Sequence, residues 1–113
     1  MGFAQDEIDE LKALCSGLSA GEEGGVTYFL LPQITVPEGC SPARVDALLC
    51  PVPRDGYEFR LYFAQPVTSK RALNWHVSGA RILERNWHAF SWKANRTGLR
   101  LAQMVSLQLA ALR

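Results

Sequence analysis

The strongest constraint on the fold is a series of three short strand-like segments, residues 26–31, 43–50 and 57–63. They are rich in β-branched, aromatic and aliphatic residues, and proline- and glycine-rich links separate them. We expect the first strand to end at Pro32, because proline cannot donate to a sheet ladder. A parallel return between consecutive strands needs about a dozen residues or more, so these links predict an antiparallel meander.

Apolar and polar residues alternate along two of these segments. One side of the third segment carries Tyr57, Phe59, Leu61 and Phe63. Such alternation predicts a sheet with one buried and one exposed face. The exposed face supplies six candidate partner-binding residues: Thr27, Arg44, Asp46, Glu58, Arg60 and Tyr62. The turn over residues 33–37 is a further candidate contact.

Amphipathic helices are predicted at both ends of the chain. Between residues 5 and 18 the apolar residues recur at three- and four-residue steps, and acids occupy the first turns, where the helix dipole favours them. We expect a turn from Gly17 through Gly25. A second apolar stripe predicts a helix over residues 97–112, with Thr97 at the N-cap position. Its members are Leu101, Met104, Val105, Leu109 and Leu112.

All three tryptophans and both histidines lie between residues 67 and 95. This segment has no long period, so we expect a loop, a short strand or turn at residues 75–77 and a short helix near 80–90. The tryptophans Trp75, Trp87 and Trp92 are expected to cover one end of the core; an exposed anchor surface is the less favoured alternative. His88 and Trp92 are four residues apart and would share a helical face, as a structural contact rather than a catalytic pair.

The order of these elements predicts a single α+β domain over residues 1–113. It has an N-terminal helix, an antiparallel three- to four-stranded meander, an irregular tryptophan-rich segment and a C-terminal helix. Residues 1–60 carry ten acids and four bases, and residues 61–113 carry one acid and eight bases. We expect the two halves to complement each other within one fold. Nucleic-acid binding by the basic half is the less favoured interpretation.

The sequence lacks the common signatures of catalysis and metal binding. No serine lies in a Gly-x-Ser-x-Gly context, no glycine loop is suited to phosphate, and His76 and His88 are too far apart for a usual ligand spacing. We therefore expect no catalytic residue, metal or cofactor. Cys15 and Cys50 are expected in the core, and Cys40 in an exposed turn.

The odd number of cysteines without metal spacing is typical of a reducing compartment. The N-terminus does not resemble a signal peptide, and no apolar run approaches the roughly 20 residues that span a bilayer. The sequence thus predicts a cytoplasmic protein without membrane contact.

Several motifs resemble the prokaryotic E2 family E of the ubiquitin-conjugating superfamily. They lie at residues 23–28, 31–32, 37–46 and 48–53, and continue with His88-x-x-x-Trp92 and Leu99. The resemblance implies an E2 fold: a first helix, a four-stranded antiparallel meander, an irregular segment and further helices. In catalytic relatives a His-Pro-Asn triplet and then a nucleophilic cysteine follow the meander. The segment after Phe63 contains neither.

Without an acceptor thiolate, the resemblance implies a noncatalytic E2-like module that docks a ubiquitin-like protein. Another conjugation component, such as an E1-like protein or an active E2 protein, is also a possible partner. The alternative is an unorthodox E2-type transferase that carries the modifier covalently on Cys40 or on a hydroxyl group.

Overall fold

The computed structural model describes residues 3–53, 56–70, 73–75, 77–92 and 98–112. Within these ranges it contains two helices and six strands. They are α1 (Gln5–Leu14), β1 (Ser19–Glu23), β2 (Val26–Thr35), β3 (Arg44–Cys50), β4 (Arg60–Phe63), β5 (Val77–Ile82), β6 (Arg85–Ala89) and α2 (Leu101–Ala110). The strands form one antiparallel sheet in the order β1-β2-β3-β4-β6-β5. The α+β prediction is confirmed, but the strand count exceeds the three or four expected.

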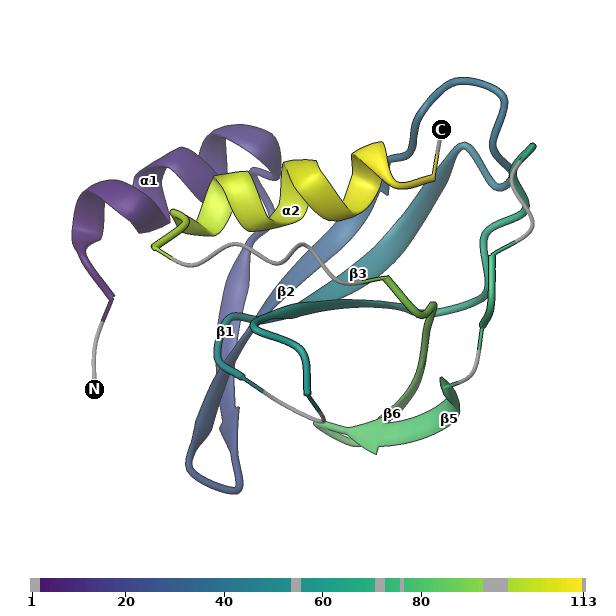
Figure 1. Cartoon of the computed structure of the whole chain (residues 1–113). Helices are drawn as coiled ribbons and strands as arrows, with labels where there is room; N and C mark the ends of the chain where they lie inside the picture. Colours follow the sequence, from purple (N-terminus) through teal and green to yellow (C-terminus); the bar gives the residue numbers. More distant parts are fainter. Residues whose placement is uncertain (1–2, 54–55, 71–72, 76, 93–97, 113) are drawn as a thin grey trace.

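Both helices cover the same face of the sheet and pack against each other (Figure 1). Their apolar stripes build what we call the helix-side core, which includes Leu11, Leu31, Leu49, Leu101 and Val105. Both helices are shorter than expected. α1 ends at Leu14, and α2 begins at Leu101, where the Arg100 N–H donates to Gln103 Oε1 at 2.8 Å. The predicted cap Thr97 lies outside the described residues.

The helix expected near residues 80–90 is wrong, because this segment forms the β5–β6 hairpin. Leu83 and Glu84 turn the chain with φ values of 49° and 65°, the left-handed conformation that two-residue hairpin turns require. Trp87 and Ala89 then point to the same side of β6, with a period of two rather than 3.6. The predicted short strand at residues 75–77 corresponds in part to the start of β5, while His76 lies outside the described residues.

The hairpin lies across the sheet face opposite to the helices (Figure 1). Its side chains build the hairpin-side core, whose buried members are Tyr28, Leu48, Cys50, Tyr62, Ile82, Trp87 and Ala89. Trp87 is 1% exposed, and its indole N–H donates to the Ile82 carbonyl at 3.0 Å. The sheet therefore curls, so that both faces of its central strands are buried.

The hairpin is joined to the rest of the sheet by little backbone pairing. Only Phe63 and His88 form a register pair between β4 and β6 in the described residues. At its other end the turn reaches β1, where the Leu83 N–H donates to Glu23 Oε1 at 3.1 Å and the Leu83 side chain lies over Gly21. Side-chain packing therefore provides most of the hairpin's attachment.

Two further expectations at the start of the sheet are wrong. Residues 19–23 form β1 rather than part of a turn, because Gly24 and Gly25 take φ values of 61° and 79° and close a tight hairpin. β2 does not end at Pro32 but continues to Thr35 through an irregularity, with a register shift between Leu31 and Ile34 and a φ of 52° at Gln33. Proline is tolerated there because this half of β2 pairs with β3 alone.

The tryptophans pack as expected. Trp75 and Trp92 lie half-buried against the helix-side core, where the Trp75 ring is 5.2 Å from the Phe90 ring in an edge-to-face arrangement. No helix in the described part of the chain is long and apolar enough to cross a membrane.

Candidate functional site

The six residues predicted to form one exposed sheet surface have different environments. Arg44 and Glu58 are exposed, while Thr27 and Asp46 are half-buried. Arg60 and Tyr62 are each only 2% exposed, so their predicted place on the surface is wrong. The reason is the β5–β6 hairpin, which covers the sheet face that the alternation had marked as polar.

Arg60 is part of the interior. Its guanidinium carbon lies 4.0 Å from the centre of the Tyr57 ring, and Nη2 is 3.5 Å from the Phe90 carbonyl oxygen. Aromatic faces and carbonyl oxygens both stabilise a buried guanidinium. Reversing this charge would disrupt the fold, so Arg60 is unsuited to testing a binding surface.

Asp46 holds three parts of the molecule together. Its Oδ1 accepts hydrogen bonds from the Gln33 backbone N–H at 2.8 Å and from Gln33 Nε2 at 2.9 Å. Its Oδ2 pairs with Arg85 Nη2 at 3.0 Å. The hydrogen bonds from Gln33, and then the contact with Arg85, hold the pKa of Asp46 below its usual value. Asp46 therefore fixes the irregular point of β2 to β6 rather than presenting a free charge.

The two family-motif residues do not share a helical face, because β6 replaces the expected helix. His88 is half-buried in β6, opposite Phe63 of β4. Trp92 follows the strand and packs against the helix-side core. The prediction that they face each other across one helical turn is wrong.

The second half of β2 has an open edge. β1 pairs with β2 only from Val26 to Leu30, so in the described residues Leu31–Thr35 has a strand neighbour on the β3 side alone. Thr35 lies opposite Arg44, and the next residue, Val36, donates its N–H to the Ala43 carbonyl at 3.0 Å. Because hydrogen bonds alternate along an antiparallel ladder, the Thr35 N–H and C=O point away from β3, toward the open side.

A groove runs along this edge and the loop that follows it. Its first part, of about 400 Å³, lies between residues 14–17 at the end of α1, residues 32–35 of β2, and Arg44. Its second part, of about 300 Å³, lies between residues 35–37 and the last turns of α2. Its third part, of about 430 Å³, is lined by residues 37–40, Lys70 and Leu112. Thr35 and then Pro37 are shared between neighbouring parts, so we treat the three as one edge groove.

The edge groove brings together the predicted turn over residues 33–37 and the predicted contact residue Arg44. Sequence reasoning missed Leu14 and Lys70. Leu14 is 50% exposed and is the large hydrophobic side chain that the described residues leave in solvent. In a helix that continued to residue 18, Leu14 would lie on the buried apolar stripe. Because α1 ends at Leu14, this side chain lies on the rim of the edge groove instead.

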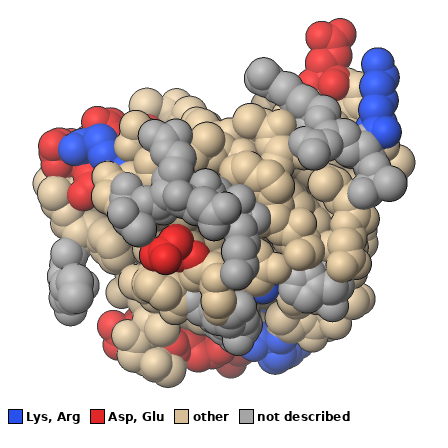
Figure 2. Space-filling model, viewed as in Figure 1, with Lys and Arg blue, Asp and Glu red and all other residues tan. Residues whose placement is uncertain are grey.

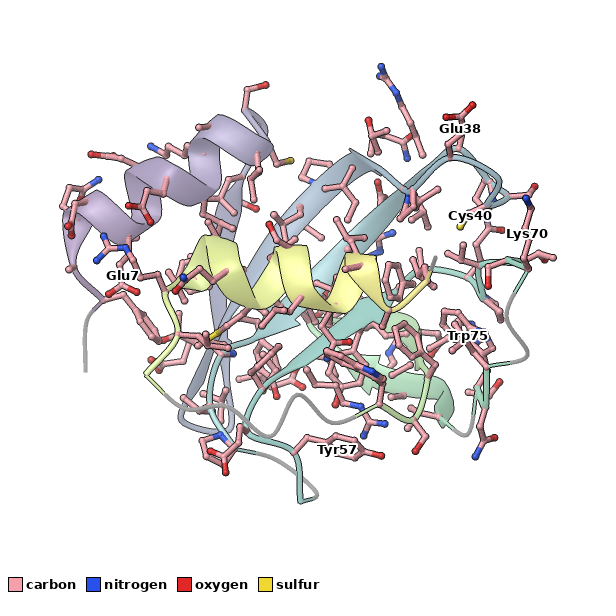
Figure 3. All side chains as sticks on the ribbon, turned by 45° about the horizontal axis from the view of Figure 1, so that its top comes forward. Glu7, Glu38, Cys40, Tyr57, Lys70 and Trp75 are labelled. Carbon is pink, nitrogen blue, oxygen red and sulfur yellow. The ribbon has the colours of Figure 1, made fainter. Side chains whose placement is uncertain are left out.

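Charges are sparse around the edge groove. Arg44 and Lys70 are exposed, and neither has an ion-pair partner within the described part of the chain. Glu38, Cys40 and Lys70 gather at the loop end of the groove (Figure 3). On the face viewed in Figure 2, most charged side chains lie at the margins. The groove thus offers an apolar rim at Leu14 and an exposed cation at Arg44.

The cysteines follow the expectations in part. Cys15 and Cys50 are buried, as predicted. Cys40 is half-buried rather than exposed, with its Sγ 3.7 Å from the Leu112 carbonyl oxygen in the third part of the edge groove. No cluster of three or more histidine, cysteine or acidic side chains suited to a metal ion occurs in the described residues.

No family model, curated protein or solved structure matches this chain. The functional proposal therefore rests on the geometry and chemistry of the edge groove.

Proposed function

We propose that the protein is a noncatalytic E2-like docking module that holds a ubiquitin-like protein, or another conjugation component, in a bacterial ubiquitin-like pathway. The observation that carries the docking function is the edge groove, where a strand edge that no described strand pairs, an apolar rim and an exposed arginine meet. Open sheet edges are common sites of peptide recognition. The E2-like part of the proposal rests on the sequence motifs and on the order of first helix, antiparallel strands and closing helix, whereas the six-stranded sheet differs from a four-stranded meander.

The edge groove replaces the flat sheet surface that the sequence suggested. The β5–β6 hairpin covers the sheet face opposite to the helices, so a partner cannot lie there without displacing Trp87. Of the original set, Gln33, Thr35 and Arg44 remain exposed and Pro37 is half-buried, whereas Ile34 and Val36 belong to the helix-side core. The partner is therefore held at the end of the sheet, beside the last turns of both helices.

A second candidate function is a transferase that carries the modifier covalently. The observation that favours it is the position of Cys40, whose thiol lines a pocket of about 430 Å³ together with Lys70. Transfer of an activated C-terminus to this thiol would form a thioester and release the carrier that delivered it.

The mass of the protein after incubation with a bacterial ubiquitin-like protein, its activating enzyme and ATP tests both functions. A docking module gives a complex in the native spectrum that disappears on denaturation. A transferase gives an adduct that survives denaturation and is lost in Cys40→Ala. An unchanged mass under both conditions would contradict both functions, and Cys15→Ala, at a buried cysteine, is the matched control for the cysteine substitution.

A further inference from the structure

We propose that the edge groove binds an extended segment of the partner as an added β-strand beside the second half of β2. The segment carries apolar residues that face Leu14 and acidic residues that face Arg44. This inference rests on the proposed docking function and specifies how the partner is held.

The backbone provides the first argument. Thr35 presents its N–H and C=O toward the groove because its neighbours in the ladder, Ile34 and Val36, use theirs toward β3. A strand laid in the groove completes this pairing, in the way that sheet domains bind extended peptides. Residues 15–17 lie beside Pro32, and beyond that residue no described strand takes the position that β1 holds beside the first half of β2.

The side chains define the chemistry of the segment. Ile34 and Val45 are paired and belong to the helix-side core, so Thr35 and Arg44 face the other side of the sheet. Arg44 is exposed and lines the same part of the groove as Thr35. Side chains of an added strand alternate likewise between the Leu14 side and the Arg44 side. Apolar residues match the first side, and carboxylates match the exposed Arg44 guanidinium on the second.

The two outer strands of the sheet are less suited to accept a partner. β1 carries Glu22 and Glu23 at its end, and the Glu23 carboxylate already bonds the hairpin turn. β5 has a register shift at Gly79, where φ is 78°, and such irregularities prevent continuous pairing. The open half of β2 contains no acidic residue; the turn after α1 reaches it only at Pro32 in the described residues, and Thr35 borders the groove.

The probe for the test is an eight-residue peptide in which valine and glutamate alternate. Two further versions carry N-methyl groups on alternate residues, so that each loses the hydrogen-bond donors of one edge. Binding is followed by amide hydrogen exchange and by NMR shifts of the whole protein. We expect protection at Thr35, and we expect one N-methylated version to lose at least tenfold in affinity while the other retains it. Equal loss in both versions, or no change at residues 33–37, would overturn the proposed mode of binding.

Arg44→Glu tests the charge argument with the same peptide. Reversing an exposed charge that faces glutamates is expected to weaken binding about tenfold. Arg81→Glu, an equally exposed reversal on β5, is the matched control and should leave binding unchanged. Equal effects of the two reversals would show that the peptide responds to net charge and not to the groove.

Repeating the exchange experiment with the ubiquitin-like protein separates this inference from the proposed function. Protection at Thr35 that Arg44→Glu weakens supports both. Binding with protection elsewhere, and no effect of Arg44→Glu, leaves the docking function intact and overturns the strand-addition mode. If the peptide binds and the ubiquitin-like protein does not, strand addition in the edge groove is supported and the proposed identity of the partner is contradicted. A concentration-dependent dimer of the protein that protects Thr35 would show that a second copy occupies the edge, which also overturns the proposal.

Discussion

The two faces of the sheet are covered in different ways. On one face, two helices that contact each other bury a large apolar cluster. On the other, a hairpin of two strands, six and five residues long, does the same for a smaller cluster, although in the described residues one register pair joins it to the neighbouring strand. The amphipathic helices contribute many apolar side chains to the helix side, whereas a few large side chains attach the hairpin to the other face. The comparison predicts that a single core substitution lowers the free energy of unfolding more on the hairpin side than on the helix side.

The largest effect is expected for Trp87→Ala. Removing a fully buried indole from the hairpin-side core leaves a cavity and a lost hydrogen bond to the Ile82 carbonyl, so the free energy of unfolding should fall by about 3–5 kcal/mol. Chemical denaturation measures the change. Trp92→Ala, at a half-buried tryptophan outside the strands, is the control and should cost clearly less. A smaller loss for Trp87→Ala than for Trp92→Ala would refute the anchoring role of Trp87.

Leu101→Ala is expected to cost about 2–4 kcal/mol on the helix side, because a side chain that is 1% exposed is truncated. Combining it with Trp87→Ala tests whether the two faces are independent. Distant sites usually add to within about 0.5 kcal/mol. A coupling well above that, measured by denaturation of the two single variants and the double variant, would show that the sheet transmits strain between its faces.

Asp46→Asn is expected to lower the free energy of unfolding by about 1–2 kcal/mol at neutral pH, since hydrogen bonds that link Gln33 and Arg85 are weakened. The pKa of Asp46 is lowered in the folded protein, so its stabilisation is present above its ordinary pKa of 3.8 and is lost as the pH falls below it. The variant and the original protein should therefore become more alike in stability between pH 5 and about pH 3. A difference that does not change over this range would exclude an ionised role for Asp46.

The smallest effect is expected for Gly21→Ala, where the sheet meets the hairpin turn. An added Cβ would lie 2.9 Å from a methyl carbon of Leu83, but this is the flexible end of a side chain that can move. We expect the free energy of unfolding to fall by less than about 1 kcal/mol. When Leu83 is already alanine, adding Gly21→Ala should cause no further loss, because the contact is gone. A persistent loss in the pair would indicate that β1 itself, rather than the contact, resists the change.

The same comparison explains what the sequence could predict. The apolar stripes of α1 and α2 and the cores of β2, β3 and β4 follow local periods and were found, although the ends of the helices were not. The hairpin was missed because residues 80–90 contain no glycine or asparagine at the turn: Leu83 and Glu84 adopt positive φ values instead. Its turn is held by the Glu23 carboxylate of β1, which accepts from the Leu83 N–H, and by the burial of Trp87 of the hairpin against the sheet.

The candidate site was predictable only in part. Arg44, predicted as a contact from strand alternation, and residues 33–37, predicted as a contact turn, line the groove. Arg60 and Tyr62 were misplaced, since alternation shows which residues share a face and cannot show what later part of the chain covers that face. Lys70 and Leu14 meet the groove only through tertiary structure, so no local signal marks them.

The contacts of Asp46 have a consequence for the evolution of this chain. Gln33, Asp46 and Arg85 lie on three different strands and depend on one carboxylate. In a relative without Asp46, the Arg85 guanidinium and the left-handed backbone at Gln33 would both lose the carboxylate that accepts their hydrogen bonds. We therefore expect these three positions to covary, with Arg85 and Asp46 exchanged together and glycine or asparagine admitted at position 33 wherever the acid is absent. Such a pattern among diverged sequences would identify members of this fold whose overall identity is too low to show kinship.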